Sequence, residues 1–167
     1  MKVTLSPEEM SLAVDVANKR FLYSLLTKGR DSVNPKGWSD AFNSHLLGCI
    51  GEIAAAKALD MPWPAHIARF KSKPDLGNRI EVRHRTDPDW ELIVRDDDSP
   101  HSLFVLSTGG ISPVVEVVGW IDGKRAMRKD WRHDHGGKKE AWFVPQSFLL
   151  PLDMLKELDN EPVEFKK

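Results

Sequence analysis

Apolar positions in the first third of the chain recur with the period of an α-helix. The motif Ser6-Pro7-Glu8-Glu9 is typical of a helix start, because its serine can cap the helix and its last glutamate can complete a capping box. Leucines and valines then follow at helical spacing, which predicts a helix over residues 7–27. A second run of this kind predicts a helix over about residues 44–59, which two prolines follow closely.

The period changes in the middle of the chain. Five short runs rich in Val, Ile and aromatic residues alternate with Gly, Pro, Asn and Asp, which predicts strands joined mostly as hairpins. Trp142–Pro145 predicts a further short strand, and leucines about three apart predict a C-terminal helix over residues 147–158. The five runs are His66–Phe70, Arg79–Arg85, Glu91–Asp96, Ser102–Ser107 and Val114–Ile121.

The order of these elements indicates the fold class. Two helices, a run of strands and a last helix predict one α+β domain over residues 1–167, with a mixed β-sheet of about five strands flanked by helices. Hydrophobic residues make up 41% of the chain, which is enough for a core and too much for a disordered protein.

Composition also bears on the compartment. The uncharged apolar stretch Leu103–Val115 is too short to span a membrane, and the first residues lack the apolar region of a signal peptide. Cys49 is the only cysteine, so no internal disulfide can form and the residue is expected to be a small buried hydrophobe. A cytoplasmic protein without membrane contact is therefore expected.

Charge is distributed unevenly although the net charge is only −1. Basic blocks over residues 66–85 and 122–139 flank an acidic block over residues 87–98. Two basic blocks are compatible with a local phosphate-binding surface and equally with a solvated face. The basic residues that we assign to nucleic-acid binding are Lys71, Lys73, Arg79, Arg85, Lys124 and Arg125.

The most informative polar residues surround a predicted turn at Gly77-Asn78. Asp75 precedes the turn and Glu81 lies in the strand that follows. Because residues two apart on a strand share a face, Glu81, Arg83 and Arg85 are expected to project together. An acid and two guanidinium groups on one face, beside another acid, are costly to bury without a purpose. The residues expected on the opposite face are Ile80, Val82 and His84.

These residues resemble the signature of the PD-(D/E)XK nuclease superfamily, which includes many restriction enzymes. The first half of that motif corresponds to Pro74-Asp75 and the second half to Ile80-Glu81-Val82-Arg83. Gly51-Glu52, in an alanine-rich helix, resembles the glutamate in the family's first helix. The resemblance covers about residues 43–145 and looks especially like small phage-encoded members. It implies a restriction-endonuclease-like core and, for a phage protein, a location in the host cytoplasm.

The resemblance implies a metal-dependent nuclease that hydrolyses phosphodiester bonds of nucleic acid, with DNA as the expected partner. Asp75, Glu81 and the backbone carbonyl of Val82 would bind Mg²⁺ or Mn²⁺, which take oxygen ligands. Glu52 would bind a second ion or orient a ligand water, and the metal would activate the attacking water. The catalytic residues would be Glu52, Asp75, Glu81 and Arg83. Many relatives dimerise to cut both strands, so a homodimer is compatible with the resemblance.

Arg83 departs from the family pattern, which has lysine at this position. Arginine keeps the positive charge and can bind a phosphate through two N–H groups, but it cannot lose a proton near neutral pH. Electrostatic stabilisation would therefore survive, whereas a proton-transfer role would not. Two alternatives stay open: a nuclease-fold protein without catalysis that acts as a nucleic-acid-binding or protein-binding, inhibitory module, and a structural protein with incidental polar residues.

Three other polar groups have less specific patterns. His45 lies seven residues before Glu52 on the same helical face and could line the site or be structural. His133-Asp134-His135 lacks the further ligands of a tetrahedral zinc site, and a basic loop near DNA is the stronger functional reading. Asp96-Asp97-Asp98 does not have EF-hand spacing and is expected at an exposed hairpin tip.

Overall fold

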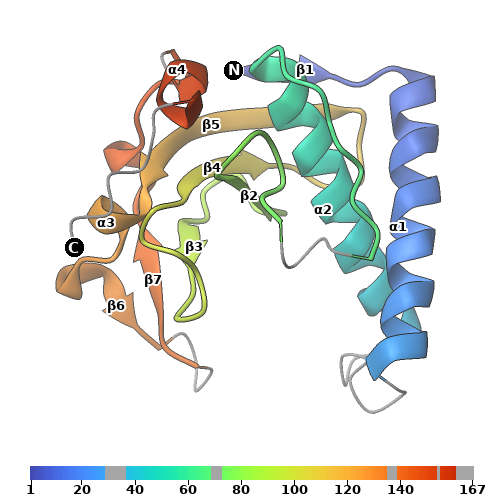
Figure 1. The fold of residues 1–167 in the computed structure, drawn as a ribbon, viewed down its shortest axis with the longest axis horizontal. Helices are drawn as coiled ribbons and strands as arrows, with labels where there is room; N and C mark the ends of the chain where they lie inside the picture. The colour runs from blue at the N-terminus through green and yellow to red at the C-terminus, as the bar shows by residue number, and fades with distance from the viewer. Residues whose placement is uncertain (29–36, 69–72, 135–138, 154, 161–167) are drawn as a thin grey trace.

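The protein folds into three layers, formed by a pair of long helices and two β-sheets (Figure 1). The computed structural model describes residues 1–28, 37–68, 73–134, 139–153 and 155–160. It is a mixed α+β fold, as the order of elements predicted.

The helical layer consists of α1 (Pro7–Lys28) and α2 (Trp38–Ala58), which pack side by side. The predicted capping box is confirmed, because the Ser6 N–H donates to Glu9 Oε2 at 2.6 Å and the Glu9 N–H donates to Ser6 Oγ at 3.2 Å. The first helix has the predicted length, and the second begins six residues before the predicted start at residue 44.

The buried stripe of α1 is not made of its leucines. Leu12, Leu22 and Leu26 are exposed, and the helix instead buries Ala13, Val16, Ala17 and Arg20. Small side chains in this stripe leave little distance between α1 and α2, which is the usual effect of alanine at a helix–helix contact.

The middle layer is a four-stranded sheet with strand order β1-β5-β4-β2. β1 (Lys2–Thr4) and β5 (Val114–Asp122) are antiparallel, as are β5 and β4 (Leu103–Thr108). β2 (Ile80–Arg85) runs parallel to β4 and forms one edge of the sheet. The central strand β4 is buried along its whole length, which explains its nearly continuous apolar sequence.

The third layer is a small antiparallel sheet with strand order β3-β7-β6. It contains β3 (Leu92–Val94), β6 (Arg132–His133) and β7 (Ala141–Val144). Short helical elements follow β5 and β7: α3 (Gly123–Ala126), the 3₁₀ turns Lys129–Trp131 and Gln146–Phe148, and α4 (Leu155–Asn160).

Two hydrophobic clusters lie on opposite faces of the four-stranded sheet. Ile80 and Val82 of β2 belong to the cluster against α1 and α2. Phe104 of β4 belongs to the second cluster, with Leu92 and Val94 of β3. Since side chains alternate along a strand, Glu81, between Ile80 and Val82, lies on the face of β2 opposite to the helices.

The arrangement of the strands differs from the prediction. Instead of one sheet joined by hairpins, the described residues contain seven strands in two sheets. Only β4 and β5 form a predicted hairpin, because the chain leaves the larger sheet after β2, adds β3 to the smaller sheet and then returns to β4. Residues 66–68 form no strand, and residues 69–70 of that predicted strand lie outside the described residues.

The prediction of a helix over residues 147–158 is wrong for its first half. Leu150 pairs with Trp120 as an isolated β-bridge, with N–H···O distances of 2.8 and 2.9 Å. Pro151 explains this difference, because the residue before a proline is disfavoured in the α-helical region. The helix begins only at Leu155. In the part of the chain that the structure describes, no helix combines the length and the apolar character needed to cross a membrane.

Candidate functional site

The two acids of the motif meet at the free edge of β2. The chain before β2 makes a tight turn in which Gly77 has φ of +53°, a conformation that favours glycine. Asp75 precedes this turn, and its Oδ2 accepts a hydrogen bond of 2.8 Å from the backbone N–H of Val82. Because Val82 directly follows Glu81 in the strand, the turn brings the Asp75 carboxylate to the same short stretch of β2 as Glu81.

The surroundings of Asp75 disfavour its negative charge. Burial, and after it the neighbouring carboxylates of Glu52 and Glu81, raise the pKa of Asp75 from 3.8 to about 8. The Val82 N–H and the Arg83 guanidinium act in the opposite direction and do not compensate. Burial also raises the pKa of Glu81. Carboxylates from α2, from the turn and from β2 therefore act on one another, and an added cation would relieve their repulsion.

Glu52 is held in a buried ion pair with Arg20 of α1. Arg20 donates from Nη1 to Oε1 at 2.6 Å and from Nη2 to Oε2 at 2.8 Å, and the two side chains are 4% and 8% exposed. Trp63 Nε1 also donates to Oε2, at 2.8 Å. Both carboxylate oxygens of Glu52 are thus engaged by the protein, and Glu52 influences Asp75 through its charge.

Arg83 bridges the acids and the loop after β3. Its Nη2 donates to Asp98 Oδ1 at 2.7 Å. Its Nη1 lies 3.5 Å from Glu81 Oε2 and 3.4 Å from the carbonyl oxygen of Val82. Burial opposes the charge of Arg83, but Asp98 and Glu81 outweigh this effect, so that the pKa is raised. The guanidinium therefore touches two of the three oxygen ligands that the sequence assigned to a metal ion.

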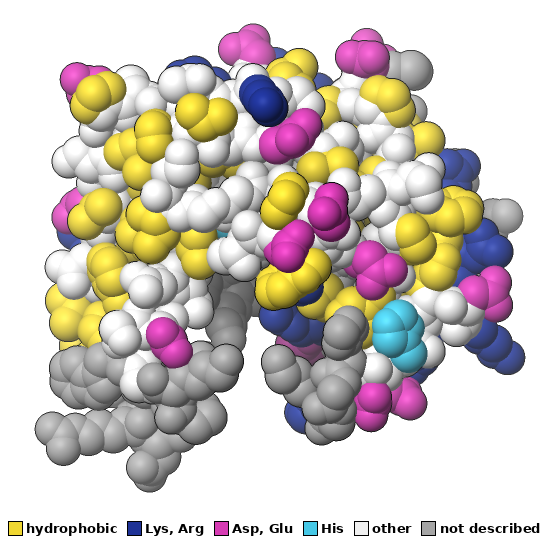
Figure 2. All heavy atoms as spheres, turned by 180° about the vertical axis from the view of Figure 1, so that it is seen from behind, with side chains coloured by type: hydrophobic (Ala, Val, Ile, Leu, Met, Phe, Trp, Pro, Cys, Tyr) yellow, Lys and Arg dark blue, Asp and Glu magenta, His cyan; other side chains and the backbone are white. Residues whose placement is uncertain are grey.

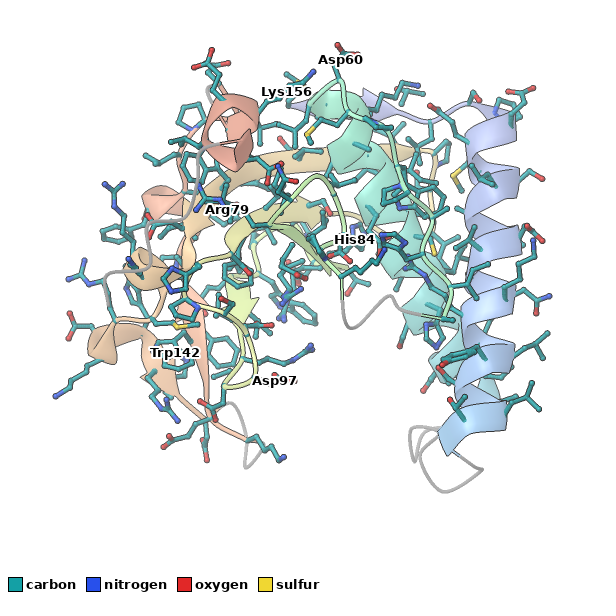
Figure 3. The ribbon with its side chains drawn as sticks, in the orientation of Figure 1. Asp60, Arg79, His84, Asp97, Trp142 and Lys156 are labelled. Atoms are coloured by element: carbon teal, nitrogen blue, oxygen red, sulfur yellow. The ribbon has the colours of Figure 1, made fainter. Side chains whose placement is uncertain are left out.

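The face of β2 that points to the helices explains why a glycine, Gly51, directly precedes Glu52 in α2. His84 lies between β2 and α2 (Figure 3), with Nδ1 3.0 Å from Ser107 Oγ and Nε2 2.8 Å from the Gly109 carbonyl oxygen. A Cβ at Gly51 would come within 2.7 Å of both His84 Cβ and Ser107 Oγ. The absence of a side chain at Gly51 lets α2 approach the strand and brings Glu52 towards Asp75.

The turn between the two acids is held by a residue that sequence analysis missed. Asp159 of α4 is 2% exposed, and its carboxylate accepts the backbone N–H of Asn78 at 2.9 Å and that of Arg79 at 2.9 Å. The Arg79 guanidinium also donates to the carbonyl of Leu158. We call this contact between α4 and the turn the Asp159 clasp.

Removal of the clasp is expected to destabilise the protein. Asp159→Ala leaves two backbone N–H groups of the turn without their charged acceptor, which should lower the free energy of unfolding by about 2–3 kcal/mol. Urea denaturation followed by tryptophan fluorescence measures the change. Asp153→Ala, an exposed acid of the same segment, is the matched control and should change stability by less than about 0.5 kcal/mol. Equal stability of the two variants would contradict the role of the clasp.

The raised pKa of Asp75 gives the stability of the protein a defined pH dependence. Between about pH 4 and pH 8 the folded protein keeps a proton on Asp75 that the unfolded chain has lost. The free energy of unfolding should therefore fall as the pH rises through this window, by up to about 1.4 kcal/mol per pH unit. Urea titrations at several pH values in chelator should give a clearly smaller slope for Asp75→Asn. An unchanged slope would contradict the raised pKa.

Of the residues assigned to nucleic-acid binding, Arg79 and Arg85 lie near opposite ends of β2, and Lys124 and Arg125 lie in α3. Arg79, at the start of β2, is bound to the carbonyls of His101 and Leu158, and Figure 3 shows it on the side of α4. Arg85, at the other end of β2, stacks on Trp90. Lys71 lies outside the described residues. Lys73, Lys124 and Arg125 are exposed, and Arg125 forms an ion pair with Asp122. On the side of β6 and β7, Figure 2 shows basic and acidic side chains interspersed.

The less specific polar groups have mixed outcomes. The ring of His45 lies 6.5 Å from that of Phe21 in α1, so this histidine packs between the helices. His133 is exposed and stacks on Phe143, and His135 lies outside the described residues. Cys49 is buried as predicted, and burial raises its thiol pKa to about 12.

The acidic run at residues 96–98 was predicted as an exposed tip, and this is wrong for its last member. Asp96 and Asp97 are exposed, whereas the Asp98 side chain is only 15% exposed. Asp98 Oδ1 accepts from Arg83, and Oδ2 accepts from the backbone N–H of Arg95 at 2.7 Å. The spacing of the run gave no indication of this role, which depends on β3 lying next to β2.

The described residues contain no group of three or more His, Cys, Asp or Glu side chains arranged to hold a metal ion. The ligands expected at this site are a different set, composed of two carboxylates and the backbone carbonyl of Val82. Comparison of the chain with models of protein families, with curated proteins and with solved structures found no match.

Proposed function

We propose that the protein is a metal-dependent nuclease that hydrolyses phosphodiester bonds, with DNA as its substrate. The observation that carries this proposal is the hydrogen bond from the Val82 N–H to Asp75, which joins the two acids at the free edge of β2. The proposal includes a restriction-endonuclease-like core over about residues 43–145, in which α2 supplies Glu52 and β2 supplies Glu81.

The residues present fit a hard divalent cation such as Mg²⁺ or Mn²⁺. Asp75 and Glu81 both carry raised pKa values, so a cation beside them would replace mutual repulsion by attraction. Within the described residues, the Val82 N–H is the one hydrogen-bond donor to the Asp75 carboxylate, which leaves Oδ1 available. When bound, the ion would polarise the phosphoryl oxygen and lower the pKa of the attacking water.

The other residues of the site would position charge around the phosphate. Arg83 keeps its proton at neutral pH, so it would bind the phosphate or stabilise developing negative charge and would not act as a base. Asp98 holds the guanidinium of Arg83 in place. Glu52, engaged by Arg20 and Trp63, would strengthen the negative potential at Asp75 without contacting the substrate.

Cleavage of a labelled DNA in Mg²⁺, Mn²⁺ and excess chelator tests the proposal. We expect cleavage with either metal and none with chelator. Calorimetry should detect Mn²⁺ binding. Its affinity should rise about tenfold for each unit by which the pH is raised towards pH 8, because the ion displaces one proton from Asp75. Absence of both cleavage and Mn²⁺ binding would overturn the proposal.

A second candidate is a nuclease-fold protein without catalysis that acts as a binding module. The position of Arg83 Nη1, within 3.5 Å of Glu81 and Val82, favours it, because this guanidinium competes with a metal ion for the same oxygens. Arg83→Lys separates the candidates. The binding module predicts an inert wild type and a variant that gains Mn²⁺ binding, whereas the nuclease predicts Mn²⁺ binding by both.

A further inference from the structure

An open groove lies on the outer face of the three-stranded sheet. Its volume is about 1030 Å³, at the upper end of the range for small-molecule sites in proteins. Ile93 of β3 and Phe143 of β7 are paired residues and form its floor, while their neighbours Leu92 and Val144 point to the opposite face, into the core. The floor of the groove therefore lies on the face of this sheet that points away from the core.

Arg85 enters this groove without a charged partner. Its guanidinium stacks on the ring of Trp90 at 4.6 Å, and its Nε is buried without a hydrogen bond. Within the described residues Arg85 forms no ion pair, and the carboxylates of Glu91 and Asp87 act on its charge without a direct contact. Burial and the nearby Arg95 lower the pKa of Arg85, and the carboxylates of Glu91 and Asp87 offset this effect only in part. A guanidinium held in this way is suited to an anion supplied by a ligand.

Aromatic side chains accompany the arginine. Trp90 is 48% exposed, although it lies in the groove wall. Phe143 lies on the floor, stacked with His133 at 4.5 Å between ring centres. Phe143 is buried, so Trp90 is the ring that a ligand can reach. An exposed aromatic ring beside a basic side chain is a feature with which proteins bind unpaired nucleotides, because every base has a face that can stack.

The groove also contains acids, which argue against a duplex. Glu91, Asp96, Asp97 and Glu140 are among its lining residues, and Figure 3 labels Asp97 near the lower end of the molecule. Double-stranded DNA carries a dense row of phosphates, which such a surface would repel. A single nucleotide has one phosphate, which Arg85 can bind. Its base can have an amino group, which can donate a hydrogen bond to a carboxylate of the groove.

The groove is continuous with the acids. Glu81, Arg83 and Arg85 lie two residues apart on one face of β2, so that each step from the acids towards the groove measures about 6.6 Å. Asp98 links the two regions, because one oxygen accepts from Arg83 and the other from the N–H of Arg95, which lines the groove. A strand bound at the acids can therefore continue into the groove.

We infer that this groove binds an unpaired nucleotide of the strand whose phosphodiester lies at Asp75 and Glu81. The base stacks on Trp90, and the phosphate contacts Arg85. The inference rests on the proposed function and deepens it, because it makes single-stranded DNA, or a duplex with an unpaired end, the substrate class.

Fluorescence anisotropy in chelator tests the groove separately from cleavage. The probes are a labelled single strand of about 12 nucleotides, within the usual site sizes of single-strand binders, and its blunt duplex. The wild type should bind the single strand more tightly than the duplex. Arg85→Gln and Trp90→Ala should each weaken single-strand binding about tenfold, and circular dichroism should show that both variants are folded.

The chain provides a matched control. Arg128 stacks on Trp131 at 4.9 Å, the same type of contact as that of Arg85, and neither residue lines the groove. Arg128→Gln should leave single-strand binding unchanged. An equal loss in this control, tighter binding of the duplex, or unchanged binding by both groove variants would overturn the inference.

The outcomes also separate the inference from the proposed function. If the wild type cleaves DNA and the groove variants bind and cleave equally well, the inference about the groove is excluded and the proposed nuclease function stands. If the wild type cleaves nothing in any metal and the groove variants lose single-strand binding, the proposed nuclease function is excluded and the groove stands as a site for unpaired nucleotides.

Discussion

Replacement of Glu81 by glutamine or alanine is expected to abolish metal-dependent cleavage while the protein stays folded. The side chain is 26% exposed, and its contact with Arg83 is long, at 3.5 Å, so the fold does not depend on it. Loss of this carboxylate would remove one of the two acidic ligands. Metal ions contribute several kcal/mol to such reactions, which corresponds to a rate loss of about a thousandfold or more.

Single-turnover cleavage rates in Mg²⁺ measure this effect, with Glu116→Gln as the control. Glu116 is an exposed acid in β5, distant in the sheet order from the edge formed by β2. The control should cut at the rate of the wild type. The urea concentration at which half of the Glu81→Gln protein is unfolded should be equal to or higher than that of the wild type, because the substitution removes one of several carboxylates that repel each other. A Glu81 variant that cuts normally would exclude the proposed mechanism.

Arg20→Ala is expected to have the largest effect on stability. The substitution leaves the carboxylate of Glu52 buried without its bidentate partner, and the carbonyl of His66 also loses the Arg20 Nε donor. Breaking a buried ion pair by removal of one partner usually costs about 3–5 kcal/mol, a large part of the stability of an ordinary domain. Urea denaturation at neutral pH should show this loss.

Two variants make this result specific. Lys19→Ala removes the neighbouring exposed ion pair with Asp15, whose side chains are 52% and 54% exposed, and should cost less than about 1 kcal/mol. Adding Glu52→Gln to Arg20→Ala should restore part of the loss, because the remaining buried group is then neutral. Equal stability of the Lys19 and Arg20 variants would contradict the buried character of the pair.

The acids were predictable because their arrangement is local. A turn signal at residues 77–78 and the alternation of side chains in a strand are enough to place Asp75 and Glu81 near each other. The partners that hold this arrangement come from distant parts of the chain. Asp98 reaches Arg83 only because β3 joins a second sheet, and no local pattern specifies that sheet.

The first helix shows that spacing can predict an element without giving its buried face. Its capping box and its spacing predicted the helix, but of the apolar residues that gave the spacing Val16 is buried, whereas Leu12, Leu22 and Leu26 are exposed. Size decided the packing, since Ala13 and Ala17 allow the close contact with α2. Arg20 follows Ala13 and Ala17 at helical spacing, and a charged residue in a stripe of small residues is the signal that would have identified it.

The Asp159 clasp has a consequence for the time at which the site matures in the cell. Asp159 lies 81 positions after Asn78, whose backbone it binds. At ribosomal rates of about 5–20 residues per second, translation needs a further 4–16 seconds or so to reach it. The segment that carries Asp75 and Glu81 is therefore translated well before its anchor exists. A nascent chain would carry both acids without a fixed geometry until Asp159 has been made and has bound the turn.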